Sequence, residues 1–194
     1  MITLQLVTTE QEMNGVLALQ QANLRKNITQ EEAESQGFLM AEYDLDFLEL
    51  LHSASPGIIA KDGEKVIGYS LVALPETARH HPLLADLVQN IERCVFKGKP
   101  VENYVIVAQL CVSKGYRGQD LVQKLYGIFR DHYANQFTYC VTDVAQANHR
   151  SLKAHQKRGF QVIDTLDYGG IGWDIVLWDW HKKAAQESQT ANYP

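Results

Sequence analysis

The segment KGYRGQD at residues 114–120 joins a buried strand to a helix, and its residue types suit the binding of an anion. The first amides of a helix have no partner within the helix, and the helix dipole favours negative charge beside them. Lys114 and Arg117 flank these amides and would add charge-assisted contacts to phosphate oxygens. The segment therefore predicts a phosphate cradle, with an ordinary capped turn between strand and helix as the alternative.

Two stretches resemble the signatures of GNAT acetyltransferases. AQLCVSKGYRGQDLVQKLY is similar to the family's central strand and its Arg/Gln-x-x-Gly-x-Gly/Ala loop, which grips the CoA pyrophosphate, and Arg117 and Gly118 match that loop. NHRSLKAHQKRGF is similar to the second signature, an Asn, a small residue, an aromatic and then Gly-Phe at the head of a strand. The residues that fit it are Asn148, Ser151, Gly159 and Phe160. The resemblance covers residues 105–163 well and a preceding hairpin loosely.

The resemblance implies both a fold and an activity. The fold is α/β (α+β), a central, mixed, largely antiparallel twisted sheet of about seven strands whose central strands splay apart, flanked by helices. The activity is acetyl-CoA-dependent transfer of an acetyl or short acyl group to a primary amine of a small molecule or peptide. The cofactor-binding residues that it implies are Leu110, Cys111, Val112, Arg117, Gly118, Gln119, Asp120, Leu121, Val122, Asn148, Ser151 and Lys153.

Two residues of the loop depart from the family's pattern. Asp120 and Val122 stand where the family has small residues that let the main chain approach pyrophosphate. A carboxylate beside a phosphate is repulsive, so we expect Asp120 to turn away and to cap the helix that begins here. Weak CoA binding, or a shifted position of the cofactor, is the alternative.

The third departure is His155, which stands where the family has a tyrosine that protonates the leaving thiolate. An imidazole with an unperturbed pKa near 6.5 would donate this proton when charged, although less of it is charged above neutrality. A histidine on the helix surface without a catalytic role is the alternative.

The resemblance also implies an oxyanion donor and leaves the general base open. It places a strand bulge near Leu110–Val112, with the Val112 amide as the group that polarises the thioester carbonyl. Asp143, near the end of the next strand, and Glu102, at the entry to the central strand, are the acidic candidates for the base. We name His155, Asp143 and Val112 as the catalytic candidates, with a water relay as the alternative to a direct base.

The acceptor pocket is expected to involve residues 40–47 and an insertion at 78–87, which contains His80 and His81. An adjacent histidine pair without a third ligand predicts a loop surface and no metal site. An aromatic set near the C-terminus indicates core or dimer contact, with a substrate cage as the alternative, so a homodimer is left open. Its members are Tyr168, Trp173, Trp178 and Trp180. None of these patterns identifies the acceptor.

The same departures support a second class of function. A noncatalytic module on this fold, which binds acyl-CoA or senses another ligand, is favoured by the unusual residues Asp120, Val122 and His155. Binding of acetyl-CoA without release of free CoA would distinguish it from an enzyme.

The elements that must position these residues alternate between helix and strand periods. We expect strands at 2–7, 103–113, 138–144, 160–164 and 171–178, a hairpin over 57–74, and helices at 10–23, 30–36, 45–53, 80–96, from 118 or 120 to 133, and at 148–158. The run at 103–113 is apolar on both faces, so it should be the central strand.

Composition limits the remaining possibilities. A chain of 194 residues suits one domain, expected at 1–183 with a polar tail at 184–194. A net charge of −5 favours no nucleic-acid partner, and no apolar run is long enough for a membrane span. The first residues show no secretory pattern, so a cytoplasmic protein is expected. Cys94, Cys111 and Cys140 are expected to be reduced and mostly buried, with no paired metal spacing.

Overall fold

The computed structural model describes residues 1–181. The helices are α1 (Glu10–Gln21), α2 (Gln30–Gln36), α3 (Leu45–Ala54), α4 (Pro75–Ala78), α5 (Pro82–Ile91), α6 (Leu121–Tyr133) and α7 (His149–Arg158), with short 3-10 turns at η1 (Arg25–Asn27) and η2 (Lys114–Tyr116). The strands are β1 (Ile2–Leu6), β2 (Ile58–Asp62), β3 (Lys65–Ala73), β4 (Val95–Phe96), β5 (Lys99–Pro100), β6 (Tyr104–Val112), β7 (Tyr139–Ala145), β8 (Gln161–Tyr168) and β9 (Ile171–Asp179). The predicted tail at 184–194 lies outside the described residues.

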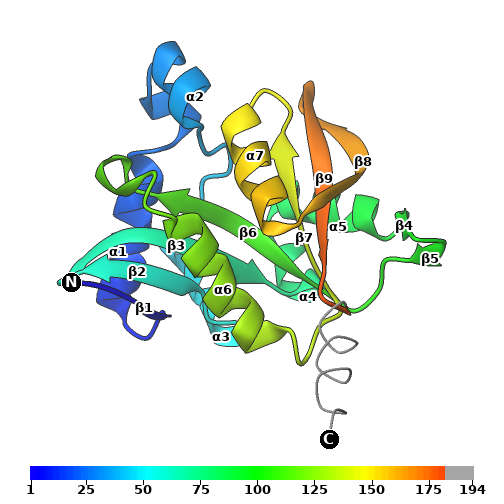
Figure 1. The fold of residues 1–194 in the computed structure, drawn as a ribbon, viewed down its shortest axis with the longest axis horizontal. Helices are drawn as coiled ribbons and strands as arrows, with labels where there is room; N and C mark the ends of the chain where they lie inside the picture. Colours follow the sequence, from blue (N-terminus) through cyan, green and yellow to red (C-terminus); the bar gives the residue numbers. More distant parts are fainter. Residues whose placement is uncertain (182–194) are drawn as a thin grey trace, which may run out of the picture.

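Seven strands form one sheet in the order β1-β2-β3-β6-β7-β9-β8, and only the β6–β7 pair is parallel. Helices α6 and α7 lie in front of this sheet in Figure 1, and α3, α4 and α5 lie behind it. The predicted mixed, largely antiparallel sheet flanked by helices is therefore confirmed. Within residues 1–181 no helix combines the length and the apolarity that crossing a membrane requires.

A separate hydrophobic core covers each face of the sheet. On the face of α6, the buried residues include Leu125 and Phe129, which pack against Val105 and Val176 of the sheet. On the opposite face, residues of α1, α3 and α5 pack against side chains such as Ile106. The alternation of strand side chains between the faces explains why β6 is apolar on both sides, because both faces are covered.

The two central strands separate after three residue pairs. Strand β6 pairs with β7 only from Tyr104↔Tyr139 to Ile106↔Val141, whereas β7 stays paired with β9 along its whole length. The Thr142 hydroxyl donates a last hydrogen bond to the Val107 carbonyl at 2.8 Å. We call the space between the strands beyond this point the wedge. The predicted splaying of the central strands is confirmed.

The bulge of the central strand lies earlier than expected. Leu71 of β3 pairs with Gln109, but the next residue, Val72, pairs with Val107, so Ala108 is the extra residue. The prediction of a bulge near Leu110–Val112 is wrong in position, because both of those residues keep regular partners in β3. The Ala108 carbonyl, displaced from the ladder, instead accepts a hydrogen bond from the Tyr43 hydroxyl at 2.8 Å.

The expected helix at 80–96 is shorter and ends in a hairpin. Helix α5 stops at Ile91, and β4 and β5 form a two-stranded ribbon that the periodicity of the sequence did not indicate. Lys97 and Gly98 have φ values of 52° and 78°, and positive φ at both central residues suits a two-residue hairpin turn. The KGK stretch therefore turns a hairpin, where the sequence had suggested only the end of a helix.

Candidate functional site

The loop before α6 presents a row of free main-chain amides. In the hydrogen bonds of the described chain, no amide from residue 118 to residue 123 is a donor, and Lys124 is the first to bond back, to the Asp120 carbonyl. Gly118 and Asp120 both have left-handed backbone, with φ of 81° and 56°. Successive amides in such a turn, followed by a helix start, form a concavity that favours an anion. The loop therefore has the geometry of a phosphate cradle.

Asp120 pairs with a lysine of α7 and does not cap the helix. Its side chain makes no capping hydrogen bond, and the Oδ1 atom accepts from the Lys157 Nζ of α7 at 2.9 Å. The cation beside it lowers the pKa of the Asp120 carboxyl. The expectation that Asp120 caps α6 is wrong, and the ion pair with Lys157 takes the place of the cap. The left-handed backbone explains why a small residue such as glycine suits this position.

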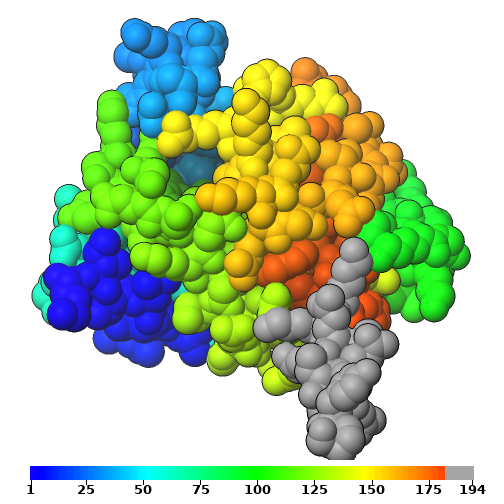
Figure 2. Space-filling model, in the orientation of Figure 1, coloured from blue at the N-terminus to red at the C-terminus, as the bar shows by residue number. Residues whose placement is uncertain are grey.

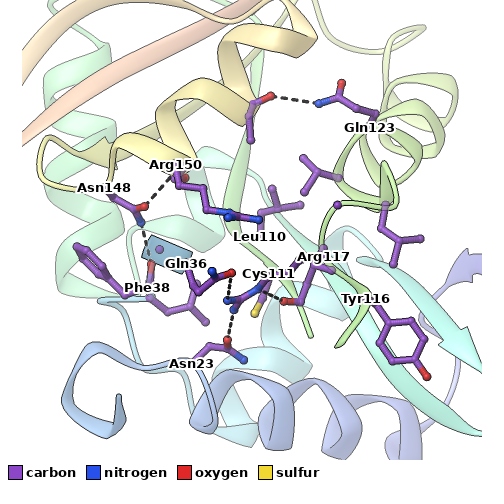
Figure 3. A pocket seen from close by; sticks show the side chains of 18 of the residues that line it. Asn23, Gln36, Phe38, Leu110, Cys111, Tyr116, Arg117, Gln123, Asn148 and Arg150 are labelled. Atoms are coloured by element: carbon purple, nitrogen blue, oxygen red, sulfur yellow. Dashed lines mark hydrogen bonds between the residues drawn. The ribbon is translucent and has the colours of Figure 1, made fainter. Parts of the chain in front are cut away.

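Arg117 points into the molecule. Its Nε donates to the Val112 carbonyl at 3.0 Å, and its two terminal nitrogens reach the side chains of Asn23 and Gln36 (Figure 3). The guanidinium thus ties the end of β6 to the segment around α2. Its contacts fill donor sites that would otherwise be available to a phosphate.

The segment 35–39 is held across the wedge by the start of α7. Asn148, the N-cap of that helix, donates to the Phe38 carbonyl at 3.0 Å, and Arg150 donates to the Ser35 carbonyl at 3.2 Å. Gly37 has a φ of 78°, and a Cβ there would lie 2.9 Å from the Asn148 Oδ1. Only glycine meets both constraints without strain.

A cavity of about 240 Å³ lies between this segment, the loop at 116–123 and α7. Figure 2 shows its mouth as a hollow between α2, the loop before α6 and α7. Its charged lining residues are Arg117, Asp120, Arg150 and Lys157, so cations outnumber the single carboxylate. We call this space the first cavity. It would favour a ligand with several negative charges.

The cofactor candidates from the sequence fall into two groups. Those that line the first cavity are Leu110, Cys111, Val112, Arg117, Gly118, Asp120, Leu121, Val122, Asn148 and Ser151. Gln119 and Lys153 are exposed and do not line it. On α7, Lys153 is rotated about 160° from Ser151 and does not line the cavity, whereas Ser151, Ala154 and Lys157 do.

The amides of Leu110 and Val112 point toward the wedge. Ser113 donates to the Ile67 carbonyl across the β3–β6 ladder, and hydrogen-bonded pairs alternate along an antiparallel ladder. Cys111 therefore bonds to β3, whereas Leu110 and Val112 direct their main-chain groups to the other edge. There β7 has already turned away, so these two amides are available to a ligand.

A second, smaller cavity of about 80 Å³ adjoins the first. The two share Phe38, Leu39, Leu110, Asn148 and Ser151 as wall residues. Asp143 lines the second cavity and shares the sheet face of Tyr139 and Val141, opposite to the face that α6 covers. The wedge therefore joins an amide cradle on one face to a carboxylate on the other.

Burial, together with the nearby negative charge of Asp86, raises the pKa of Asp143 to about 7. No Lys or Arg is among the described residues that line the second cavity, so no fixed cation offsets this effect. A carboxyl that titrates near neutrality and lies in a cavity has the properties of a general base.

His155 is buried and neutral. Its Nδ1 carries the proton and donates to the Ser151 carbonyl at 2.8 Å, and its ring packs against Tyr126 and Phe160. Burial lowers its pKa to about 4. The expected alternative of a surface histidine is wrong, and the charged imidazole that an acid role needs is scarce at neutral pH.

The remaining candidates lie apart from the wedge or in packing roles. Glu102 is exposed and precedes the paired end of β6, the end opposite to the opening. His80 is exposed, whereas His81 packs its ring against Tyr43 and Phe47 with centroids 4.8 and 5.3 Å apart. The loop-surface prediction thus holds only for His80. Within the described part of the chain, no cluster of potential metal ligands occurs.

The aromatic set and the cysteines are mostly core residues. Trp178 and Trp180 are buried on the α6 face, whereas Trp173 lines the second cavity. The dimer contact that this set also suggested stays a prediction. All three cysteines are free and buried, as expected.

Sequence reasoning missed ten residues that line the first cavity, among them Asn23, Gln36, Phe38, Arg150 and Lys157. Neither of these last two, on α7, stands three or four residues from Ser151. Both share a helix face with Ala154, which lies four residues after Arg150 and three before Lys157 and was not a candidate from the sequence. The other three come from a part of the chain that lies next to the wedge only after folding.

Solved structures with the same fold are known. An N-acetyltransferase from Staphylococcus aureus Mu50 has a TM-score of 0.60 at 15% identity, over 93% of this chain and 99% of that one. Arabidopsis thaliana NAA60 in complex with acetyl-CoA has a TM-score of 0.61 at 13% identity, over 92% and 99%. The yncA protein of Salmonella typhimurium, solved with its cofactor acetyl-CoA, has a TM-score of 0.58 at 14% identity, over 94% and 96%. At such identities the likeness concerns the fold alone.

The sequence itself provides the evidence of kinship. No curated protein matches it. The sequence model of the Acetyltransferase (GNAT) family matches residues 22–160, which include β6, the amide cradle, α6, β7 and α7. This match spans more than half of the chain and contains residues that line both cavities. The chain therefore belongs to the GNAT acetyltransferase family.

Proposed function

We propose that this protein is an acetyl-CoA-dependent N-acetyltransferase that acts on a primary amine of a small molecule or peptide. The observation that carries the proposal is the two-sided wedge. Free amides and an excess of cations lie on one face, and a carboxylate with a pKa of about 7 lies on the other. An anionic cofactor and a cationic amine would each meet the complementary charge, and they would meet beside Leu110.

The residues of the first cavity fit acetyl-CoA. The amides of residues 118–123 would hold the pyrophosphate, and Arg150 and Lys157 would supply positive charge nearby. When bound, acetyl-CoA supplies a thioester, whose carbonyl carbon bonds to the amine nitrogen while the carbon–sulfur bond breaks and the thiol leaves. The main-chain amides of Leu110 and Val112 face the wedge and would stabilise negative charge on that carbonyl oxygen.

Asp143 would take the proton of the acceptor ammonium, directly or through water. An α-ammonium group has an ordinary pKa of about 8 and a lysine-type ammonium one of about 10.4. Proton transfer to a carboxylate with a pKa of about 7 is therefore uphill by about one pKa unit from the α-ammonium and by more than three pKa units from the lysine-type ammonium. This difference favours acceptors with weakly basic amines.

His155 is assigned no acid role in this proposal. With a pKa of about 4, it is charged in roughly one molecule in a thousand at pH 7. The leaving thiolate has an ordinary pKa near 8.5 and can take its proton from the amine nitrogen as the amide forms. We propose that the histidine instead holds α7 beside the wedge by packing its ring against Tyr126 of α6, while its bond to the Ser151 carbonyl fixes the ring.

Two measurements test the proposal. Acetyl-CoA at about 100 times its dissociation constant should stabilise the protein by about 2.7 kcal/mol in a thermal-shift assay. A panel of primary amines should then release free thiol from acetyl-CoA, and Asp143→Asn should abolish the release while keeping the thermal shift. No shift with acetyl-CoA would contradict the binding site. A shift without thiol release from any amine would favour the noncatalytic acyl-CoA sensor.

A further inference from the structure

The side chain of Arg117 joins three segments that lie far apart in the sequence. Its Nε donates to the Val112 carbonyl at the end of β6, and one terminal nitrogen donates to the Asn23 Oδ1 at 2.5 Å. The other terminal nitrogen donates to the Gln36 Oε1 at 3.4 Å, at the end of α2. Figure 3 shows the three bonds meeting at one guanidinium. Because every nitrogen is engaged, this side chain must break three hydrogen bonds before it can turn toward a phosphate.

Asn23 is a buried and well-anchored partner of this guanidinium. It is 6% exposed, its Oδ1 accepts from Arg117, and its Nδ2 donates to the Leu19 carbonyl at 2.8 Å. Its main-chain carbonyl accepts from the Leu39 amide at 3.0 Å, and the Leu39 carbonyl accepts from the Arg25 amide at 2.8 Å. Leu39 is therefore held by the same short stretch of chain that Arg117 binds.

Phe38 and Leu39 form a wall that the two cavities share. On β6, Arg117 holds Val112, which stands two positions after Leu110, another residue that lines both cavities. A path of hydrogen bonds thus runs from the strand whose amides face the wedge, through Arg117, to the wall beside which an acceptor would bind. Bonds from a charged donor are stronger than neutral ones, so they hold this distance firmly.

We infer that Arg117 is a positioning residue for the acceptor, which fixes the wall at Phe38 and Leu39 relative to β6, and that it is not a ligand of the cofactor phosphates. This role differs from the one that the family's loop pattern implies. The phosphates are left to the free amides of residues 118–123 and to the two cations that α7 contributes to the first cavity. The inference rests on the proposed N-acetyltransferase function.

Arg117→Gln removes the guanidinium, and Lys124→Gln is its matched control. Lys124 is exposed, lies close enough to Asp120 to lower the pKa of that carboxyl, and lines neither cavity. Each variant therefore loses one positive charge beside the cradle, but only the first loses the link between β6 and the wall. Calorimetry with acetyl-CoA should give dissociation constants for the two variants within about threefold of each other.

A direct phosphate ligand would behave differently in this measurement. Its loss removes charge-assisted hydrogen bonds, so Arg117→Gln would bind acetyl-CoA at least about tenfold more weakly than Lys124→Gln. That result would overturn the inference.

Steady-state kinetics at saturating acetyl-CoA measure the effect on the wall. Glycinamide, a weakly basic primary amine, is the acceptor. Its KM should rise about tenfold in Arg117→Gln, while kcat stays within about threefold, because a displaced wall weakens amine binding and leaves Asp143 in place. As in the wild type, kcat/KM should still fall below pH 7. Lys124→Gln should leave KM and kcat unchanged.

Two kinetic results would contradict this role. One is an Arg117→Gln protein whose KM for glycinamide equals that of the wild type. The other is a loss confined to kcat, which would place the guanidinium in the chemical step.

Asn23→Ala tests the path itself. It removes the Oδ1 that Arg117 binds and keeps the main-chain carbonyl that holds Leu39. If Arg117 acts through Asn23, KM should rise by a similar factor in either single variant and in the double variant, because residues that act as a unit are not additive. Increases that multiply in the double variant would overturn the inference. Where Asn23→Ala does not fold, the acetyl-CoA affinity and the KM of Arg117→Gln decide the question.

Failure of the inference and failure of the proposed function give different results. A wild type that releases no thiol from any amine would contradict the proposed function, and the inference would fall with it. An active wild type whose Arg117→Gln variant loses acetyl-CoA affinity and keeps its KM for glycinamide would overturn the inference alone.

Discussion

Asp143→Asn should make the protein more stable and catalytically inactive. The folded state raises the pKa of this carboxyl from 3.8 to about 7, mainly through burial. A shift of about three pKa units means that the ionised carboxylate destabilises the folded state by about 4 kcal/mol, at 1.36 kcal/mol per unit. This is an upper bound, because water in the cavity weakens the effect. Asparagine has a similar shape and no charge, so it avoids this cost.

The sign of the pH dependence follows from proton binding. Between pH 3.8 and 7 the folded protein keeps a proton that the unfolded chain has lost, so the raised pKa makes stability fall as pH increases. The penalty is absent below the unfolded pKa and complete above the folded one. The stability advantage of Asp143→Asn over wild type should therefore be about 2.5 kcal/mol larger at pH 8 than at pH 5.

Denaturant unfolding of both proteins at pH 5 and pH 8 measures this difference. In parallel, wild-type kcat/KM should fall about tenfold per pH unit below pH 7, which gives the profile an acidic limb. For Asp143→Asn, kcat/KM should be at least about 100-fold lower than for wild type and should show no such limb. Asp86→Asn is the control, because removal of the second negative charge should move the wild-type limb to lower pH. A stability difference that does not change with pH, or an active Asp143→Asn, would refute the assignment.

Two further substitutions test the residues that depart from the family's pattern. Asp120→Gly removes a carboxylate and suits the left-handed backbone, so acetyl-CoA should bind about threefold more tightly by calorimetry; weaker binding would show that the ion pair with Lys157 supports the cradle. His155→Phe should leave kcat unchanged from pH 6 to 9, because the imidazole is neutral throughout that range, and should lower the unfolding free energy by about 1 kcal/mol through the lost bond to Ser151. A fall in kcat that follows a titration in this range would restore an acid role.

The features that could be predicted from sequence are those that local patterns encode. Periodicity identified the elements around the wedge, and the apolar run at 103–113 identified the central strand. The loop after it follows from residue types that favour a strand, a turn and a helix start in succession. These preferences act over a few residues, so one sequence is enough to detect them.

The sites of chemistry depended on partners far along the chain. The bulge at Ala108 follows from the register with β3, and Asp120 is paired with a lysine 37 residues later. Burial favours the neutral form of both Asp143 and His155. It does so by raising the pKa of the carboxyl and lowering the pKa of the imidazole.

The sequence by itself determined the order of the strands of the seven-stranded sheet and of most helices, the central strand and the turn from that strand into a helix, because each depends on neighbouring residues. Only the tertiary structure decided which side chains face the wedge and which protons they hold. Desolvation and cross-strand pairing arise from atoms that are distant in sequence and close in space. For this reason Trp173 and Asp143, thirty residues apart, become neighbours only when β7 pairs with β9.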